Sequence, residues 1–451
     1  MTGLNLNLRR CLFNNLKNIY LYKSVSKNKL MILKTIKNKH EKTCILWLLL
    51  FLSPFSALHA ERGKLISYKL VHSYSVTNLD SLWKSKKIPK FIAPINNPLD
   101  VFEVMYETVW HDGTPIKASG IFFLPREKGK AFPMICYHHG TQVVKDRKIN
   151  FEGEQAICTV FGGSGYMVAF PDYLGLGQGE KTHLYLHLES EANTSIDLLR
   201  AVKQLIAKEG AEQSKFLFLT GYSQGGHATL ATLKVMQEKY PDEFKVTASA
   251  PMSGPYDLVG KQGGVMFHPY SHPGYLPYLI YSYQEVYKCF DDPNCPFKAP
   301  YDKTLSHLFD GTYNMHDINK AMPEIPKDVL TDDFLNGYVN DDKFPFKAEL
   351  KLNSVNDWKP ETPVLLCYCK ADEQVSYENA IIASANMKAR GAKNIKLRSA
   401  GRRFGHKTCA VYSSMYTKMY FDSFLNGSKK GRKGPLGKRL ALSISKMKVK
   451  K

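Results

Sequence analysis

The sequence predicts an α/β fold in which a mostly parallel sheet is covered by helices on both faces. Three observations lead to this prediction. Apolar runs of strand length alternate with helix-like runs along most of the chain. A Gly-x-Ser-x-Gly pentapeptide at residues 221–225 lies between one such strand and one such helix. Asp372 and His406 follow the serine in that order, each after a later strand.

The predicted elements follow one another along the chain with one interruption. The strands are at residues 101–109, 118–124, 132–137, 166–169, 216–220, 246–250, 363–369 and 395–398. The helices are at residues 195–207, 224–239, 377–389 and 409–425. An insertion at about 260–358 interrupts the alternation, and we expect it to form a lid.

The Gly-Tyr-Ser-Gln-Gly segment, residues 221–225, predicts a sharp turn that carries a nucleophilic serine. An apolar run at residues 216–219 leads into it, and a helix-like run at residues 228–238 leaves it. Strand, turn and helix are the context in which this pattern holds a strained, exposed serine, here Ser223. We expect glycine on both sides because a Cβ there would collide with the neighbouring strand or helix.

A serine hydroxyl is a weak nucleophile until a base takes its proton, and a carboxylate must orient that base. Asp372 follows the buried strand at residues 363–369, and His406 follows a short strand later in the chain. Ser223, Asp372 and His406 are therefore the predicted triad. Glu373, next to the predicted acid, is the alternative carboxylate.

The other histidines are predicted to pack in the interior or to lie at the surface. His227 is on the helix that follows the serine, and we expect it to pack behind the turn and point away from the Ser223 hydroxyl. The remaining histidines precede the acid or lie in the insertion, and include His111, His183, His268 and His316.

The oxyanion of the transition state needs two hydrogen-bond donors. The first predicted donor is the backbone N–H of Gln224, at the N-terminus of a helix whose dipole also favours negative charge. The second is expected in the His-His-Gly-Thr loop after the strand at residues 132–137. We place it at the Thr141 N–H, with the Thr141 hydroxyl as a further donor and the Gly140 N–H as the alternative.

Three segments resemble the α/β-hydrolase superfamily and, within it, the secretory-lipase-like esterases. They are His-Gly-Thr at residues 139–141, Pro-Asp-Tyr-Leu-Gly-Leu-Gly at residues 171–177, and residues 221–227. The helix at residues 196–201 fits as well, so the resemblance covers about residues 65–427. It implies an α/β-hydrolase fold and hydrolysis of carboxylic esters, often acylglycerols, with no metal and no organic cofactor. The insertion matches no motif, so the resemblance says nothing of substrate choice.

Positive charge is concentrated at the two ends of the chain. The formal charge of +21 includes ten Lys/Arg against one acid in residues 1–60 and ten against none in residues 428–451, which leaves about +2 on residues 61–427. We therefore expect no nucleic acid partner for the body of the protein. Residues 428–451 are predicted to be a basic, disordered tail that could contact a membrane surface.

Residues 1–60 are predicted to contain an export signal. Lysines precede an apolar run at residues 44–52, and Ala-Leu-His-Ala at residues 57–60 is a small-x-small cleavage site. The apolar run is too short to span a membrane. Met31 is the favoured start because it gives a basic segment of ordinary length. The protein is therefore expected to be secreted or periplasmic.

Seven of the nine cysteines follow residue 60. Cys289 and Cys295 enclose a turn-rich loop, and in an exported protein we expect a disulfide to close it. The other five cysteines are expected in the core. No cysteine spacing suggests a zinc site.

The first part of the insertion is rich in tyrosine. These rings could cover the serine and suit an apolar acyl or aromatic substrate, or they could pack the insertion's own small core. They are Tyr270, Tyr275, Tyr278, Tyr281, Tyr283 and Tyr287.

Together these features predict an exported serine hydrolase that cleaves carboxylic esters through an acyl-enzyme. Its expected partner is an ester or lipid substrate. A serine peptidase or amidase on the same fold is the first alternative, because the sequence does not reveal how the leaving group is handled. A non-catalytic binding protein is the second alternative.

Overall fold

The computed structural model describes residues 61–293, 295–432 and 434–447. The predicted export signal, its cleavage site and the start at Met31 lie outside this range. No helix among the described residues is long and apolar enough to cross a bilayer.

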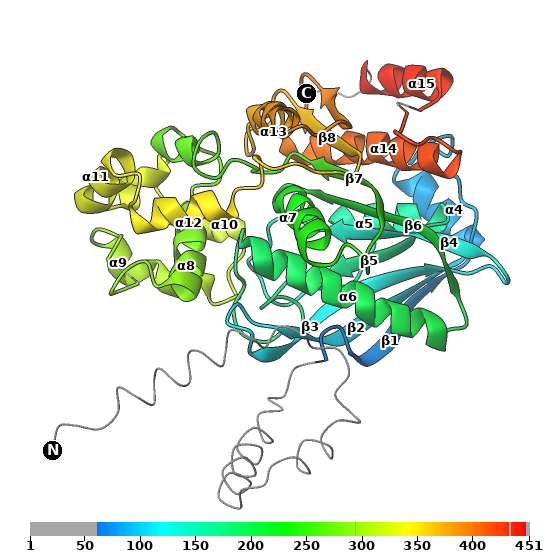
Figure 1. Cartoon of the computed structure of the whole chain (residues 1–451), viewed down its shortest axis with the longest axis horizontal. Helices are drawn as coiled ribbons and strands as arrows, with labels where there is room; N and C mark the ends of the chain where they lie inside the picture. Colours follow the sequence, from blue (N-terminus) through cyan, green and yellow to red (C-terminus); the bar gives the residue numbers. More distant parts are fainter. Residues whose placement is uncertain (1–60, 294, 433, 448–451) are drawn as a thin grey trace, which may run out of the picture. The chain divides into compact units, whose positions relative to one another are not determined.

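Nine strands form one sheet in the order β1-β2-β3-β5-β4-β6-β7-β8-β9 (Figure 1). Their bounds are β1 Leu65–Tyr74, β2 Leu99–Val109, β3 Pro115–Pro125, β4 Ala131–His138, β5 Met167–Pro171, β6 Glu212–Tyr222, β7 Val246–Met252, β8 Val364–Cys369 and β9 Ile395–Gly401. Strands β4 to β9 pair in parallel, whereas β1, β2 and β3 pair antiparallel with their neighbours. The mostly parallel sheet is thus confirmed.

The helices lie between the strands, within the insertion and after β9. Their bounds are α4 Val76–Ser85, α5 Gly153–Gly163, α6 Leu188–Lys208, α7 Gln224–Lys239, α8 Tyr275–Tyr287, α9 Tyr301–Thr304, α10 Met315–Lys320, α11 Asp332–Asn340, α12 Pro345–Asn353, α13 Glu378–Ala389, α14 His406–Leu425 and α15 Leu436–Met447. Three short 3-10 turns are η2 Gly263–Phe267, η3 Ser306–Phe309 and η4 Pro326–Val329. Strand β1, helices α4, α5 and α15 and the separate helices of the insertion are not among the predicted elements.

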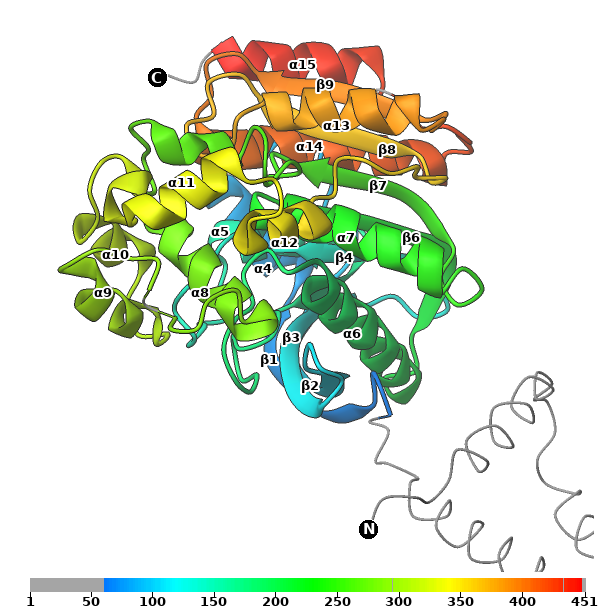
Figure 2. The same ribbon diagram turned by 60° about the vertical axis from the view of Figure 1, so that its left-hand side comes forward.

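Alternating side chains of the central strands face the two helical layers. In β4, Met134 and Cys136 belong to the core shared with α6, α7 and α13, whereas Ile135 and Tyr137 belong to the core shared with α5 and α14. This period of two is the geometry of a strand buried on both faces. Figure 2 shows α6, α7 and α13 on the near face of the sheet.

The insertion between β7 and β8 holds α8 to α12 and has an apolar core of its own. Tyr278 and Tyr283 are buried in this core, while Tyr275 also lines the cavity beside Ser223. Some of the tyrosines therefore pack the core of the insertion, and at least one lines the cavity beside Ser223.

The C-terminal segment differs from the prediction of a disordered tail. Residues Leu436–Met447 form helix α15, whose Leu442 is fully buried in the core shared with α14. Lys446 Nζ donates a hydrogen bond to the Tyr416 hydroxyl at 2.7 Å. The prediction rested on the ten Lys/Arg of this segment. It gave no weight to the apolar residues at helical spacing, which allow the segment to form a helix and pack.

Candidate active site

Ser223 occupies the turn between β6 and α7 in a strained backbone conformation. Its φ is 58° and its ψ −123°, a region that residues with a Cβ rarely adopt. An ideal Cβ at Gly221 would lie 2.4 Å from the His138 carbonyl oxygen, and one at Gly225 would lie 1.9 Å from the same atom. Only glycine fits at either position, so the predicted reason for the two glycines is confirmed.

Asp372 and His406 are joined directly. The His406 Nδ1–H lies 2.8 Å and 2.9 Å from the two carboxylate oxygens of Asp372. The backbone N–H groups of Gln374 and Val375 also donate to Asp372 Oδ1, at 3.1 Å and 2.9 Å. These bonds fix the carboxylate, which in turn orients the imidazole. The other ring nitrogen, Nε2, is left to face a substrate or the serine.

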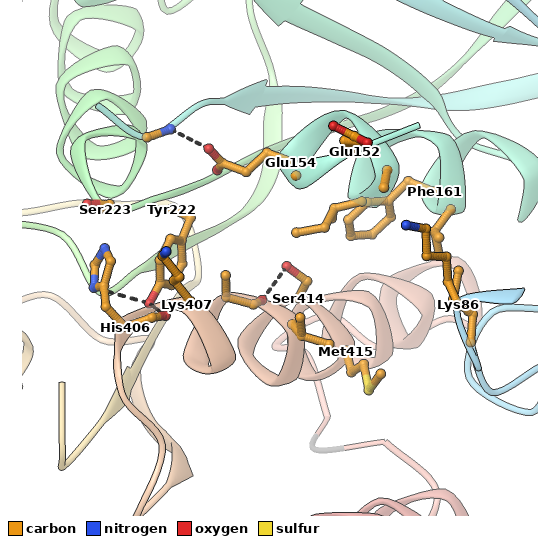
Figure 3. A pocket seen from close by; sticks show the side chains of 18 of the residues that line it. Lys86, Glu152, Glu154, Phe161, Tyr222, Ser223, His406, Lys407, Ser414 and Met415 are labelled. Carbon is orange, nitrogen blue, oxygen red and sulfur yellow. Dashed lines mark hydrogen bonds between the residues drawn. The ribbon is translucent and has the colours of Figure 1, made fainter. Parts of the chain in front are cut away.

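Ser223 and His406 line the same cavity, and Figure 3 shows both side chains at one end of it. No hydrogen bond joins their side chains in the described part of the chain. Such a loose serine–histidine arrangement is common before substrate binds, because the catalytic hydrogen bonds tighten in the complex.

Glu373, the alternative acid, contacts a different part of the histidine. Its Oε2 accepts a hydrogen bond from the His406 backbone N–H at 2.9 Å. His406 is the first residue of α14, so this carboxylate satisfies an unpaired N–H at a helix N-terminus. The structure therefore brings Asp372, and not Glu373, to the imidazole.

The predicted oxyanion donors fall into two groups. Within the described residues, the backbone N–H groups of Thr141 and Gln224 donate to no protein acceptor, so both can serve a ligand. The Gly140 N–H is already engaged, because it donates to Glu154 Oε2 at 2.7 Å. The Thr141 hydroxyl donates to the Tyr185 hydroxyl at 3.2 Å.

Glu154 is a titratable group that the sequence analysis did not identify. The backbone N–H of Gly140 donates to the Glu154 carboxyl, and an ideal Cβ on Gly140 would lie 3.5 Å from the Ser223 Cβ, so the carboxyl is close to Ser223. Burial raises the pKa of Glu154 from 4.5 to about 7, against the hydrogen bonds from the Gly140 N–H and the Tyr137 hydroxyl. No sequence motif marks this residue, because its position depends on where α5 packs.

The raised pKa of Glu154 predicts a pH-dependent stability. The folded chain holds this proton more tightly than the unfolded chain, so the stability that it contributes is full below about pH 4.5 and is lost as the pH rises to about 7. In Glu154→Gln this loss should disappear, while the amide oxygen still accepts from Gly140. Thermal unfolding across this pH range measures the difference. Glu152→Gln, at an exposed neighbour, is the control, and an unchanged pH profile in Glu154→Gln would contradict the assignment.

The Gln224 side chain is held from behind by buried groups. Its Nε2 donates to Glu191 Oε1 at 2.8 Å and lies 2.9 Å from His183 Nε2. Burial lowers the pKa of His183 to about 3, so its ring is neutral at ordinary pH. Because His183 Nδ1–H donates to the Leu174 carbonyl at 3.0 Å, its Nε2 is the acceptor for Gln224.

His227 packs behind the turn, as the sequence predicts. It is fully buried, its Nε2–H donates to the Asn353 carbonyl at 2.8 Å, and its Nδ1 lies 2.7 Å from Glu191 Oε2. These contacts join α7 to α6 and to the end of the insertion. His111, His268 and His316 are half-buried or exposed, and none of them lines a cavity beside Ser223.

Tyr222, the residue before the serine, contacts His406. Its hydroxyl donates to the His406 backbone carbonyl at 2.6 Å, and its ring centroid lies 4.8 Å from that of the imidazole. The sequence analysis gave no role to this residue, which is a variable position of the pentapeptide.

The loop at residues 171–177 braces the loop that carries Thr141. The Tyr173 hydroxyl donates to the His139 carbonyl at 3.0 Å. Asp172 is buried, and its Oδ2 lies 2.5 Å from Nη2 of Arg147. A Cβ on Gly177, whose φ is +60°, would lie 2.3 Å from an Asp172 carboxylate oxygen, which explains the glycine there.

A disulfide joins the two segments that carry Asp372 and His406. It links Cys369, at the end of β8, to Cys409 in the first turns of α14, at a sequence separation of 40. The predicted bridge is wrong, because Cys289 and Cys295 are free thiols in the structure. Two of the five cysteines assigned to the core form the bridge instead.

Removal of this disulfide is expected to destabilise the protein. Closing a loop of 40 residues lowers the entropy of the unfolded chain, which corresponds to about 4 kcal/mol of stability. The variant Cys369→Ala/Cys409→Ala should therefore unfold at much lower urea concentration and lose part of its activity. Cys289→Ser/Cys295→Ser is the matched control and should unfold like the wild type. Equal midpoints for both double variants would contradict the expectation.

A cavity of about 870 Å³ extends away from Ser223. Figure 3 shows it between α5 and α14, with Ser223 and His406 at one end and Lys86 at the other. Much of its wall is apolar, from Ile88, Ile92, Ile157, Phe161, Val411 and Met415. A second cavity of about 60 Å³ also reaches Ser223 and is lined by residues of the insertion, among them Leu279 and Phe346. The described residues contain no cluster of three His, Cys, Asp or Glu that could hold a metal ion.

Comparison with known proteins agrees with this architecture. Residues 153–278, which include Ser223, match the model of the prolyl oligopeptidase family. No curated protein sequence matches the chain.

Among solved structures, the chain is similar to a putative hydrolase from Legionella pneumophila subsp. pneumophila str. Philadelphia 1. The identity is 28% with a TM-score of 0.74, covering 81% of this chain and 99% of the other. It is also similar to the rice cell wall degrading esterase LipA from Xanthomonas oryzae, at 28% identity and a TM-score of 0.71 over 81% and 99% of the two chains. Candida antarctica lipase A shares the fold at 15% identity and a TM-score of 0.63, over 85% and 90%.

Proposed function

Because this chain belongs to the α/β-hydrolase superfamily and is esterase-like, we propose that it is an exported serine hydrolase that cleaves esters of apolar carboxylic acids. The observation that carries the proposal is the hydrogen bond of His406 to Asp372 at the Ser223 end of a large cavity with a mainly apolar wall. An oriented imidazole beside a strained serine suits acyl transfer.

In the proposed reaction, the Ser223 Oγ attacks the ester carbonyl carbon while His406 Nε2 takes its proton. The Asp372 carboxylate stabilises the imidazolium that forms. The Thr141 and Gln224 N–H groups stabilise the oxyanion. His406 then gives the proton to the leaving alcohol, which departs and leaves an acyl-enzyme. Water, deprotonated by His406, releases the acid and restores Ser223.

We assign the acyl group to the cavity between α5 and α14. An apolar chain leaves water favourably, by roughly 0.8 kcal/mol for each buried methylene, and this cavity offers an apolar wall that continues from the nucleophile (Figure 3). The small cavity under the insertion would then receive part of the alcohol.

Export is part of the same proposal. It is supported by the basic and apolar segments and the cleavage site in residues 31–60. The disulfide between Cys369 and Cys409 also favours it, because such bonds persist in oxidising compartments.

A series of uncharged nitrophenyl esters tests the proposed substrate class. We expect kcat/KM to rise by roughly fourfold for each added methylene until the cavity is full, which corresponds to the transfer free energy above. Matched peptide amides should be hydrolysed far more slowly. A maximum at acetate would argue against the cavity as the acyl site. Faster hydrolysis of the amides would favour a peptidase, a function that the match of residues 153–278 to the prolyl oligopeptidase family also suggests.

A further inference from the structure

Helix α15 carries a row of apolar side chains that the rest of the described chain leaves uncovered. Leu436 is 75% exposed, Leu440 61% and Ile444 44%. Their spacing of four residues places them along one side of the helix, whereas the buried Leu442 faces the protein. Figures 1 and 2 show α15 as the outermost helix beyond α14.

Exposed basic residues lie close to this apolar row in the chain. Lys429 and Lys430 are exposed and come shortly before α15, whereas Lys438 and Arg439 are half-buried and lie on the side of the helix that carries Leu442. Residues 428–451 contain ten Lys/Arg and no acid. The positive charge is therefore not neutralised within the segment, and it complements an anionic surface.

We propose that α15 is a docking surface for an anionic lipid membrane. The exposed leucines would enter the boundary between headgroups and acyl chains, and the basic residues would contact the lipid phosphates. A nucleic acid would satisfy the charges but would leave the apolar row in water, so lipid is the better match. The proposal does not depend on the proposed hydrolysis, since docking can be measured without turnover.

Co-sedimentation with vesicles tests the surface. The full chain carrying Ser223→Ala, which spares the lipid, is mixed with vesicles of phosphatidylcholine alone or with added phosphatidylglycerol. We expect binding to the anionic vesicles that falls with salt. Leu436→Ser/Leu440→Ser and Lys429→Gln/Lys430→Gln should each weaken it by roughly tenfold or more. Every variant keeps residues 1–60, so any contribution from them is common to all.

The matched control replaces two exposed apolar residues elsewhere. Val339 in α11 is 56% exposed and Leu352 in α12 is 68% exposed, and Val339→Ser/Leu352→Ser should bind the anionic vesicles like the parent. The proposal is overturned if Leu436→Ser/Leu440→Ser binds as tightly as the parent. It is also overturned if the parent binds duplex DNA more tightly than anionic vesicles at the same salt concentration.

Discussion

Replacement of Ser223 by alanine is expected to lower kcat for ester hydrolysis by on the order of 10⁴-fold or more. The reason is that the alanine side chain has no oxygen to attack the ester carbonyl, so the acyl-enzyme cannot form. The fold should persist, because the Ser223 N–H still donates to the Met252 carbonyl and both flanking glycines remain. Turnover of a nitrophenyl ester, measured alongside thermal unfolding, separates loss of chemistry from loss of structure.

The control for this variant is Ser414→Ala. Ser414 lines the same cavity, but its hydroxyl donates to the Ala410 carbonyl at 2.8 Å and lies 3.8 Å from the Met252 sulfur, so it contacts neither His406 nor Asp372. Its loss should leave turnover near the wild-type level. Near-normal turnover in folded Ser223→Ala would contradict the assignment of Ser223 as the nucleophile.

Asp372→Asn is expected to lower kcat by on the order of 10⁴-fold with a much smaller change in KM. The asparagine side chain can donate to His406 Nδ1 and so stabilises the wrong tautomer of the imidazole, with the proton on the nitrogen that must act as base. Pre-steady-state or steady-state kinetics with the preferred ester measure this split between kcat and KM.

Glu373→Gln is the matched test of the neighbouring carboxylate. The glutamine oxygen can still accept the His406 backbone N–H, so kcat should change only a few-fold. If Glu373→Gln were the more damaging of the two substitutions, Glu373 rather than Asp372 would be the acid.

The sequence predicted the architecture well where local pattern and burial agree. All eight predicted strands and α7 are present, because central strands buried on both faces read as continuous apolar runs. The edge strand β1 was missed, since only its inner side chains are half-buried and its alternation is weak. The predicted triad residues meet in space because loops after parallel strands share one edge of the sheet, but their catalytic roles remain predictions.

The disulfide shows what sequence reasoning overlooked. Short spacing favoured Cys289 and Cys295, yet Cys369 lies three residues before Asp372 and Cys409 three residues after His406. Since acid and base must meet, the cysteines beside them must approach each other as well, and the sequence alone contained that argument. Glu154 is different, because nothing in its local sequence reveals that α5 places it against Gly140.

The bridge between Cys369 and Cys409 also decides which part of the site should fail first on heating. A covalent link three residues from each partner keeps the acid and the base together even when β9 and α13 loosen. Ser223 has no covalent link to Asp372 or His406. It is held near them only by non-covalent contacts of β6, β7 and Tyr222. Heat inactivation should therefore separate Ser223 from a pair of Asp372 and His406 that is still intact.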